Sequence, residues 1–138
     1  MGLCLYVLSA DPGDDEDPEE IADCNVGHYS DFACFRDTIS RKLDGRQYPT
    51  LMQHSDCDGE WTLSGIPLLE RELADIASHF KRLPPEAPVN AFEHTAAYRK
   101  GAASLYDCFH NVDGENLFES LLYLCTVARE NQRPITFM

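Results

Sequence analysis

A stretch with clear helical periodicity lies near the middle of the chain, and it constrains the fold more than any other feature. Pro67 suits a first helical turn, where the N–H that proline lacks would be unpaired anyway. Beyond it, apolar residues recur at steps of three or four: Leu69, Leu73, Ile76, Phe80 and Leu83. Pro84 and Pro85 end the pattern. Because a helix with one apolar face must cover another element, the stretch predicts a layered domain with a buried core.

Two other segments show the same spacing. Ser30 is a favourable N-cap for a helix that ends at Gly45, with an apolar face made of Phe32, Phe35, Ile39 and Leu43. Asp113 is expected to cap a later helix, whose buried face carries Leu117, Leu121, Cys125 and Ala128. Residues 91–100 give a weaker helical pattern. The sequence therefore predicts three or four helices.

Short apolar runs predict strands at residues 2–8, 48–54 and 105–110, and an edge strand at residues 135–138. Together with the helices they predict an α+β fold, in which three or four helices cover a small mixed sheet. The chain has 138 residues, which corresponds to a single domain over residues 1–138.

The charge of the chain is strongly negative and uneven. Asp and Glu number 24 against 11 Lys and Arg, which gives a formal net charge of -13. The segment from Asp11 to Asp23 contains two prolines and no basic residue, so we expect an acidic loop at about residues 10–23. Such a surface repels nucleic-acid phosphates and anionic membranes, which predicts a cationic partner. We find no secretory signal and no apolar stretch long enough to span a membrane.

The densest polar stretch is HSDCDGEW, residues 54–61, which directly follows a predicted strand. Its composition predicts a tight turn whose outward carboxylates are free to bind. It does not fit a calcium-binding EF-hand loop, because aligning Gly59 with the central glycine places His54 at the first ligand position and Gly65 at the last.

Metal binding is the main alternative. His54 and Cys57 form one pair of nitrogen and sulfur ligands and Cys108 and His110 form another, as a zinc site or a metal-dependent hydrolase would need. The competing interpretation is that the cysteines are reduced and buried and that the histidines lie at strand ends. Because no nucleotide loop or serine-hydrolase motif is present, our first interpretation assigns no catalytic residue, cofactor or metal.

Four stretches resemble, in order and spacing, a family of predicted immunity proteins from bacterial polymorphic toxin systems. They are VGHYSDFACFRDTI, YPTLMQHSDCDGEW, ELADIASHFKRLPP and LYDCFHNVDGENL, and the MGLCLYV opening and PITFM ending are also similar. The resemblance implies a cytoplasmic, non-enzymatic protein that binds and blocks a cognate toxin domain. It assigns no catalytic residue, and residues 10–20 depart from the pattern in being longer than expected.

The resemblance and the charge agree on the kind of partner. Many toxin domains, nucleases above all, are basic because they approach phosphates, and an acidic inhibitor is steered toward such a surface. As partner-binding candidates we take Asp56, Asp58, Glu60 and Trp61, with Asp14, Asp15, Glu16 and Asp17 as steering charge. Two alternatives stay open here: Trp61, the only tryptophan, is more often a core residue, and an acidic run often serves solubility alone. The sequence does not indicate an oligomeric state.

Overall fold

Among the described elements, strands come first and last, and the helices and one short strand lie between them. The computed structural model describes residues 2–10, 18–55, 58–86 and 101–138. In chain order the strands and α-helices are β1 (Gly2–Leu8), β2 (Glu20–His28), α1 (Tyr29–Lys42), α2 (Pro49–Met52), β3 (Glu60–Trp61), α3 (Ile66–Phe80), α4 (Leu117–Asn131) and β4 (Ile135–Phe137). Two 3₁₀ helices, Gly45–Gln47 and Leu105–Cys108, lie in the connections.

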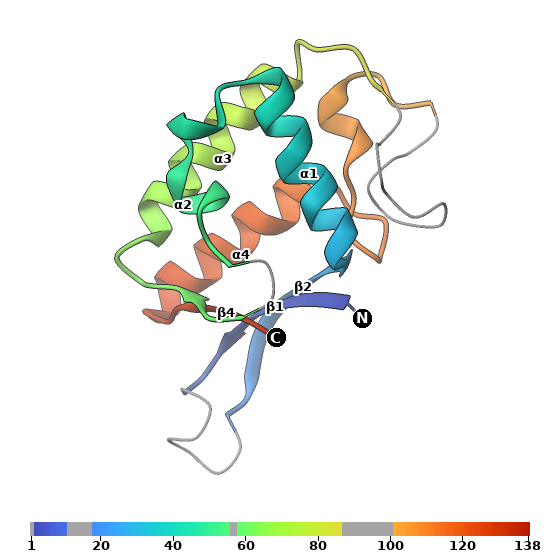
Figure 1. Ribbon diagram of the computed structural model, residues 1–138. Coiled ribbons are helices and arrows are strands. Elements are labelled where there is room, and N and C mark those ends of the chain that lie inside the picture. Colours follow the sequence, from blue (N-terminus) through green and yellow to red (C-terminus); the bar gives the residue numbers. More distant parts are fainter. Residues whose placement is uncertain (1, 11–17, 56–57, 87–100) are drawn as a thin grey trace.

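The four strands form one antiparallel sheet in the order β2-β1-β4-β3. The last strand in the sequence therefore lies inside the sheet, between the first strand and β3 (Figure 1). Tyr6 of β1 is paired with Asp23 of β2 on one side and with Thr136 of β4 on the other, and Thr136 is in turn paired with Glu60 of β3. This register defines which side chains share a face.

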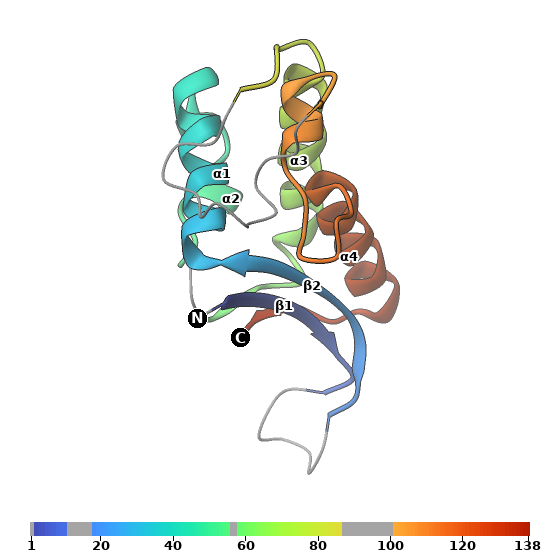
Figure 2. The ribbon, with the colours of Figure 1, turned by 90° about the vertical axis from the view of Figure 1, so that its right-hand side faces the viewer.

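The helices cover one face of this sheet. Figure 2 shows α1, α3 and α4 on the same side of the strands, and no described helix lies on the other side. The buried residues of the strands and helices form one hydrophobic cluster, in which the largest fully buried side chains are Phe32, Phe35, Phe80 and Phe118. Phe35 contacts Phe118 edge to face, with ring centroids 5.2 Å apart. The core therefore lies between the sheet and the helices.

The predicted α+β class is confirmed, and the sheet is antiparallel throughout rather than mixed. The strand at residues 2–8 and the three amphipathic helices are present, and the proline-initiated helix, α3, begins at Ile66 with Pro67 in its first turn. The caps are shifted: His28 and Asn116 precede α1 and α4, in place of Ser30 and Asp113. The weaker helical pattern at residues 91–100 lies outside the described residues.

Four predictions of local structure are wrong. The acidic loop expected to reach Asp23 ends earlier, because β2 begins at Glu20. Within residues 48–54 the chain forms the short helix α2 rather than a strand, and Pro49 lies in the first turn of that helix. Residues 105–110 begin with a 3₁₀ helix and contribute only an isolated bridge between His110 and Asn116. In addition, β4 is not an edge strand, since β1 and β3 flank it.

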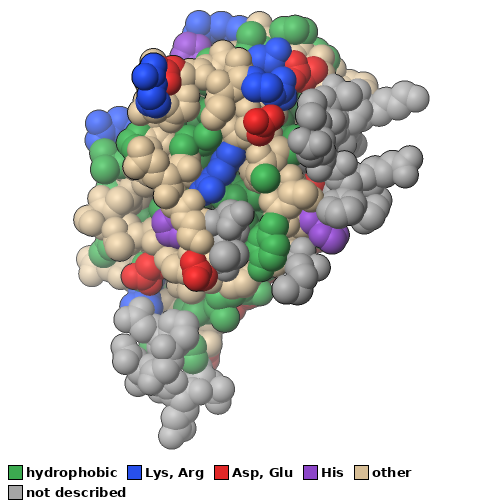
Figure 3. Space-filling view, in the orientation of Figure 1, with side chains coloured by type: hydrophobic (Ala, Val, Ile, Leu, Met, Phe, Trp, Pro, Cys, Tyr) green, Lys and Arg blue, Asp and Glu red, His purple; other side chains and the backbone are tan. Residues whose placement is uncertain are grey.

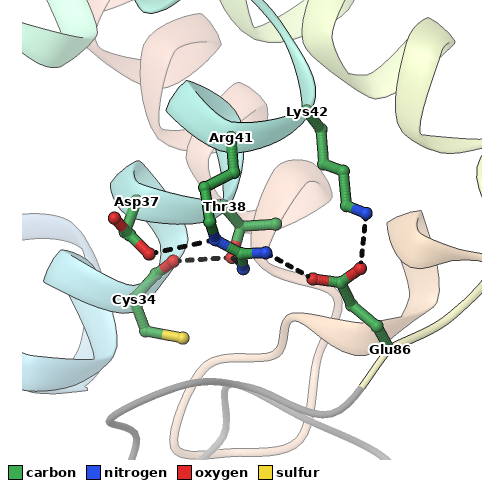
Figure 4. A network of polar contacts seen from close by, with 6 residues as sticks. All are labelled: Cys34, Asp37, Thr38, Arg41, Lys42 and Glu86. Atoms are coloured by element: carbon green, nitrogen blue, oxygen red, sulfur yellow. Dashed lines mark hydrogen bonds and ion pairs between the residues drawn. The ribbon is translucent and has the colours of Figure 1, made fainter.

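Positive charge gathers at the end of the helical layer away from the sheet. In Figure 3 most Lys and Arg side chains lie over the upper part of the molecule, where α1 and α3 end (Figure 1). There Arg41 and Lys42 both bind the Glu86 carboxylate, at 3.0 and 2.7 Å (Figure 4). In contrast, none of the four strands contains a Lys or an Arg. The sheet therefore carries only negative formal charge, from Glu20, Asp23 and Glu60.

Candidate functional site

The predicted contact residues Glu60 and Trp61 point to opposite sides of the sheet. They form the whole of β3, and successive side chains of a strand alternate between its two faces. Glu60 is exposed, whereas the Trp61 side chain is 3% exposed and belongs to the core. Only Glu60 is therefore placed to touch a partner.

Trp61 is held in the core by packing and by one hydrogen bond. Its indole N–H donates to the Thr50 carbonyl oxygen at 2.9 Å, and its ring meets Phe137 edge to face with centroids 4.7 Å apart. A buried indole needs such an acceptor, because an unpaired N–H in the core is costly. Trp61 thus connects β3 to α2 and β4, and its side chain is buried rather than displayed at the surface.

His54 positions the turn that leads into β3. Its Nδ1 lies 2.8 Å from the Ser55 carbonyl oxygen, and its Nε2 lies 2.8 Å from the carbonyl oxygen of Glu60. The imidazole also stacks on Phe137, with centroids 4.2 Å apart. Gly59 adopts a φ of 83°, a left-handed conformation that favours glycine. These contacts fix the backbone of Glu60, so that its side chain leaves the sheet on the side away from the helices.

The sheet face away from the helices brings together residues of all four strands. We call it the outer face and define it by two rows of paired residues. One row crosses the whole sheet through Asp23, Tyr6, Thr136 and Glu60. The other contains Asn25, Cys4 and Met138, and the backbones of Cys4 and Met138 are joined by hydrogen bonds of 3.2 and 2.9 Å. Directly paired residues point to the same side of a sheet, so these seven side chains form one surface.

The centre of the outer face is uncharged at neutral pH. Burial raises the pKa of the Cys4 thiol, and the nearby carboxylates of Asp23 and Glu20 raise it further. A side-chain hydrogen bond with Cys4 is the main cause that raises the pKa of Tyr6 to about 12. Both groups therefore stay protonated, and the thiol is a poor nucleophile because only a thiolate attacks readily. The outer face is suited to binding rather than to covalent chemistry.

An acidic hollow borders the outer face at the β2 edge. It has a volume of about 290 Å³ and is lined by Asp23, Glu115, Glu119, Ser120 and Tyr123. The Tyr123 side chain is 63% exposed. Sequence reasoning missed these residues. An available signal was an aromatic residue on the polar side of a predicted helix, since large exposed aromatic side chains are common in protein interfaces.

The remaining candidates divide between exposed and undescribed residues. Asp58 is exposed in the turn before β3. Asp56 lies outside the described residues, and so do Asp14, Asp15, Glu16 and Asp17. Of the carboxylates predicted to bind a partner, the structure thus describes only Asp58 and Glu60, which lie at the β3 edge of the sheet.

The proposed zinc ligands are only partly described. Cys57 lies outside the described residues, Cys108 and His110 are buried, and both ring nitrogens of His54 face carbonyl oxygens. Burial raises the pKa of Cys108, which disfavours the thiolate that zinc requires. Within residues 2–10, 18–55, 58–86 and 101–138, no group of three or more His, Cys, Asp or Glu side chains could hold a metal ion.

Comparison with known proteins identifies the family. In the described part of the chain, no helix has the length and apolar character needed to cross a membrane. No curated protein and no solved structure matches the chain. The family model described as Immunity protein 70 matches residues 18–137, which include every strand and helix after β1. Immunity proteins of this kind neutralise toxins and are not enzymes. Because the matched segment covers most of the chain, the chain belongs to the Immunity protein 70 family.

Proposed function

We propose that this protein neutralises its cognate toxin by binding the toxin domain one to one, and that the bound toxin surface is basic. The observation that carries the proposal is the charge of the sheet, whose four strands contain three carboxylates and no Lys or Arg. The formal net charge of -13 adds a long-range attraction toward any cationic partner. Membership of the immunity family implies that the partner is a toxin. The negative charge of the sheet supports a basic surface on that toxin.

A nuclease domain fits this description best. A nuclease needs a basic surface to approach phosphates, and an acidic inhibitor that covers this surface competes directly with the substrate. Such an inhibitor must act where the toxin would otherwise meet nucleic acid, so we place it in the cytoplasm of a bacterial cell that produces the toxin.

Co-expression tests the proposal. The probe is the toxin domain encoded by the adjacent gene, induced in cells with this protein, with an unrelated acidic protein of similar size, or with neither. We expect survival only with this protein, and a complex with one copy of each chain after co-purification and size-exclusion chromatography with light scattering.

Two results would contradict the proposal. Survival without a complex would show that protection does not come from binding. If the cells die and no complex forms, this toxin is not the partner. Neutralisation of this toxin by binding is then excluded as well. In either case, metal analysis of the purified protein would then test the zinc alternative, with its ligands at His54, Cys57, Cys108 and His110.

A further inference from the structure

We infer that the toxin docks on the outer face of the sheet, and that a cationic patch of the toxin spans the sheet from Asp23 to Glu60. This inference rests on the proposed function and deepens it by naming the surface. It concerns the sheet rather than the helical layer, which covers the other face of the sheet (Figure 2).

The first argument is the openness of this face. The opposite face is covered by helices and buries the residues that alternate with those of the outer face, including Leu5, Cys24, Ile135 and Trp61. The outer face has no described helix over it, and Asp23, Glu60 and Met138 are exposed, Met138 to 56%. A sheet face that no described helix covers offers a rigid platform that needs little ordering on binding.

The second argument is charge complementarity. Asp23 and Glu60 lie at the two edge strands of one paired row, about 14 Å apart if three interstrand spacings separate them. No ion pair links either carboxylate to a basic side chain among the described residues. Two Arg or Lys side chains of a partner at this separation would each meet one carboxylate, and Arg can do so with two parallel hydrogen bonds.

The third argument is the uncharged centre between those carboxylates. Tyr6 and Cys4 stay protonated and are half-buried, and Met138 adds an exposed thioether beside them. An interface usually has such a less polar centre inside a polar rim, where water is excluded and aromatic residues contribute most of the affinity. Tyr6 is therefore expected to be the central contact.

A second copy of the chain does not fit this face equally well. Pairing two outer faces would bring Asp23 and Glu60 of one copy toward the carboxylates of the other, and the strands contain no Lys or Arg to offset this repulsion. The occupant is thus a partner of opposite charge.

The test compares two double variants with the same change in net charge. The outer-face variant is Asp23→Asn with Glu60→Gln. The control is Asp37→Asn with Glu130→Gln, two exposed carboxylates on α1 and α4 in the helical layer. Affinity is measured by titration calorimetry with the purified toxin domain of the adjacent gene, inactivated by mutation. We expect the dissociation constant to rise about 10-fold or more for the outer-face variant and less than about 3-fold for the control.

Each outcome decides between the inference and the proposed function. Equal effects of the two variants would show that only net charge matters and would overturn the outer-face assignment, while toxin binding itself would stand. No binding by the wild-type protein would overturn the proposed function and the inference with it. A wild-type dimer that the outer-face variant alone dissociates would assign this face to self-association and would also overturn the inference.

Labelling of Cys4 gives a readout that does not depend on mutation. Because the Cys4 thiol ionises only above neutral pH, maleimide modification is run at mildly alkaline pH and followed for each cysteine by peptide mass spectrometry, with and without the inactivated toxin. We expect toxin to slow modification of Cys4 at least about 10-fold, because its thiol lies under the docked partner. The described cysteines 24, 34, 108 and 125 are buried and serve as internal references. An unchanged rate at Cys4 in a saturated complex would overturn the inference.

Discussion

At the scale of single residues, the contrast between Glu60 and Trp61 shows what the sequence can and cannot indicate. The polar HSDCDGEW stretch was recognisable from composition alone. The direction of each side chain was not, because it depends on pairing between β3 and β4. That pairing joins residues far apart in the chain, and a two-residue strand has too few positions to show an alternating pattern.

Replacement of Trp61 separates its structural role from a role in binding. Trp61→Phe removes the hydrogen bond to Thr50 and leaves space around a smaller ring, so we expect the free energy of unfolding to fall by about 1–3 kcal/mol. Toxin affinity of the folded variant should stay within about 2-fold of wild type, since the indole faces the core. Chemical denaturation and calorimetry measure the two quantities. A large loss of affinity in a fully folded variant would return Trp61 to the interface.

At the scale of elements, the helices were predictable and the strands only in part. α1, α3 and α4 each bury one face, and this produces the spacing of three and four that the sequence shows. β2 was missed because acidic residues at its start suggested a loop. Its buried residues Ala22, Cys24 and Val26 do alternate, and its carboxylates are tolerated because Asp23 points to the open side of an edge strand. The acidic residues thus obscured the alternation of buried and exposed side chains that is typical of a strand.

Short helices were the other source of error. The apolar run at residues 48–54 has the length of a strand, yet α2 forms there and packs against α3. Periodicity cannot separate a short buried helix from a strand when only one turn is present. The tertiary contacts decide: the Tyr48 hydroxyl donates to Asp75 of α3 at 2.6 Å, and Glu72 accepts from the backbone N–H groups of Thr50 and Leu51.

The link between α2 and α3 is testable through Tyr48. Burial first, and the hydrogen bond to Asp75 second, raise the pKa of Tyr48 to about 12. Tyr48→Phe removes this hydrogen bond, and we expect the free energy of unfolding at neutral pH to fall by about 0.5–1.5 kcal/mol. Urea denaturation measures the loss, with Tyr123→Phe as a control at an exposed tyrosine on α4. An equal fall in the free energy of unfolding in both variants would show that the hydrogen bond of Tyr48 to Asp75 does not stabilise the fold.

The same shift predicts a dependence on alkaline pH. An unfolded tyrosine ionises near pH 10, so the stabilisation linked to neutral Tyr48 is present below about pH 10 and is lost as pH rises toward 12. Between these values wild type should lose more stability than Tyr48→Phe, and the variant should show one late-ionising tyrosine fewer in ultraviolet titration. Parallel stability curves for the two proteins across this range would contradict the assigned pKa.

At the scale of the whole molecule, carboxylates outnumber basic side chains, and the formal net charge is -13. Most of the Lys and Arg side chains visible in Figure 3 lie where α1 and α3 end, and the four strands contain none. The net charge attracts a cationic protein over a distance. If the toxin surface is basic, the sheet is the part of the molecule that offers it carboxylates without Lys or Arg from the same strands.

This arrangement predicts a strong effect of salt on association. In stopped-flow mixing with the inactivated toxin, we expect the association rate constant to fall about 10-fold or more between low and physiological ionic strength, with a much smaller change in the dissociation rate. The Asp37→Asn, Glu130→Gln control should keep this salt dependence. An association rate that does not change with salt would mean that charge does not guide the encounter.

The position of β4 inside the sheet also joins distant parts of the chain. Thr136 of β4 pairs with Tyr6 of β1, although the whole helical layer separates the two residues in the sequence. Until residues 135–137 have paired, β1 and β3 have no strand between them, and the row from Asp23 to Glu60 is incomplete. We therefore expect the outer face to be completed late in folding, because contacts between distant parts of a chain form slowly.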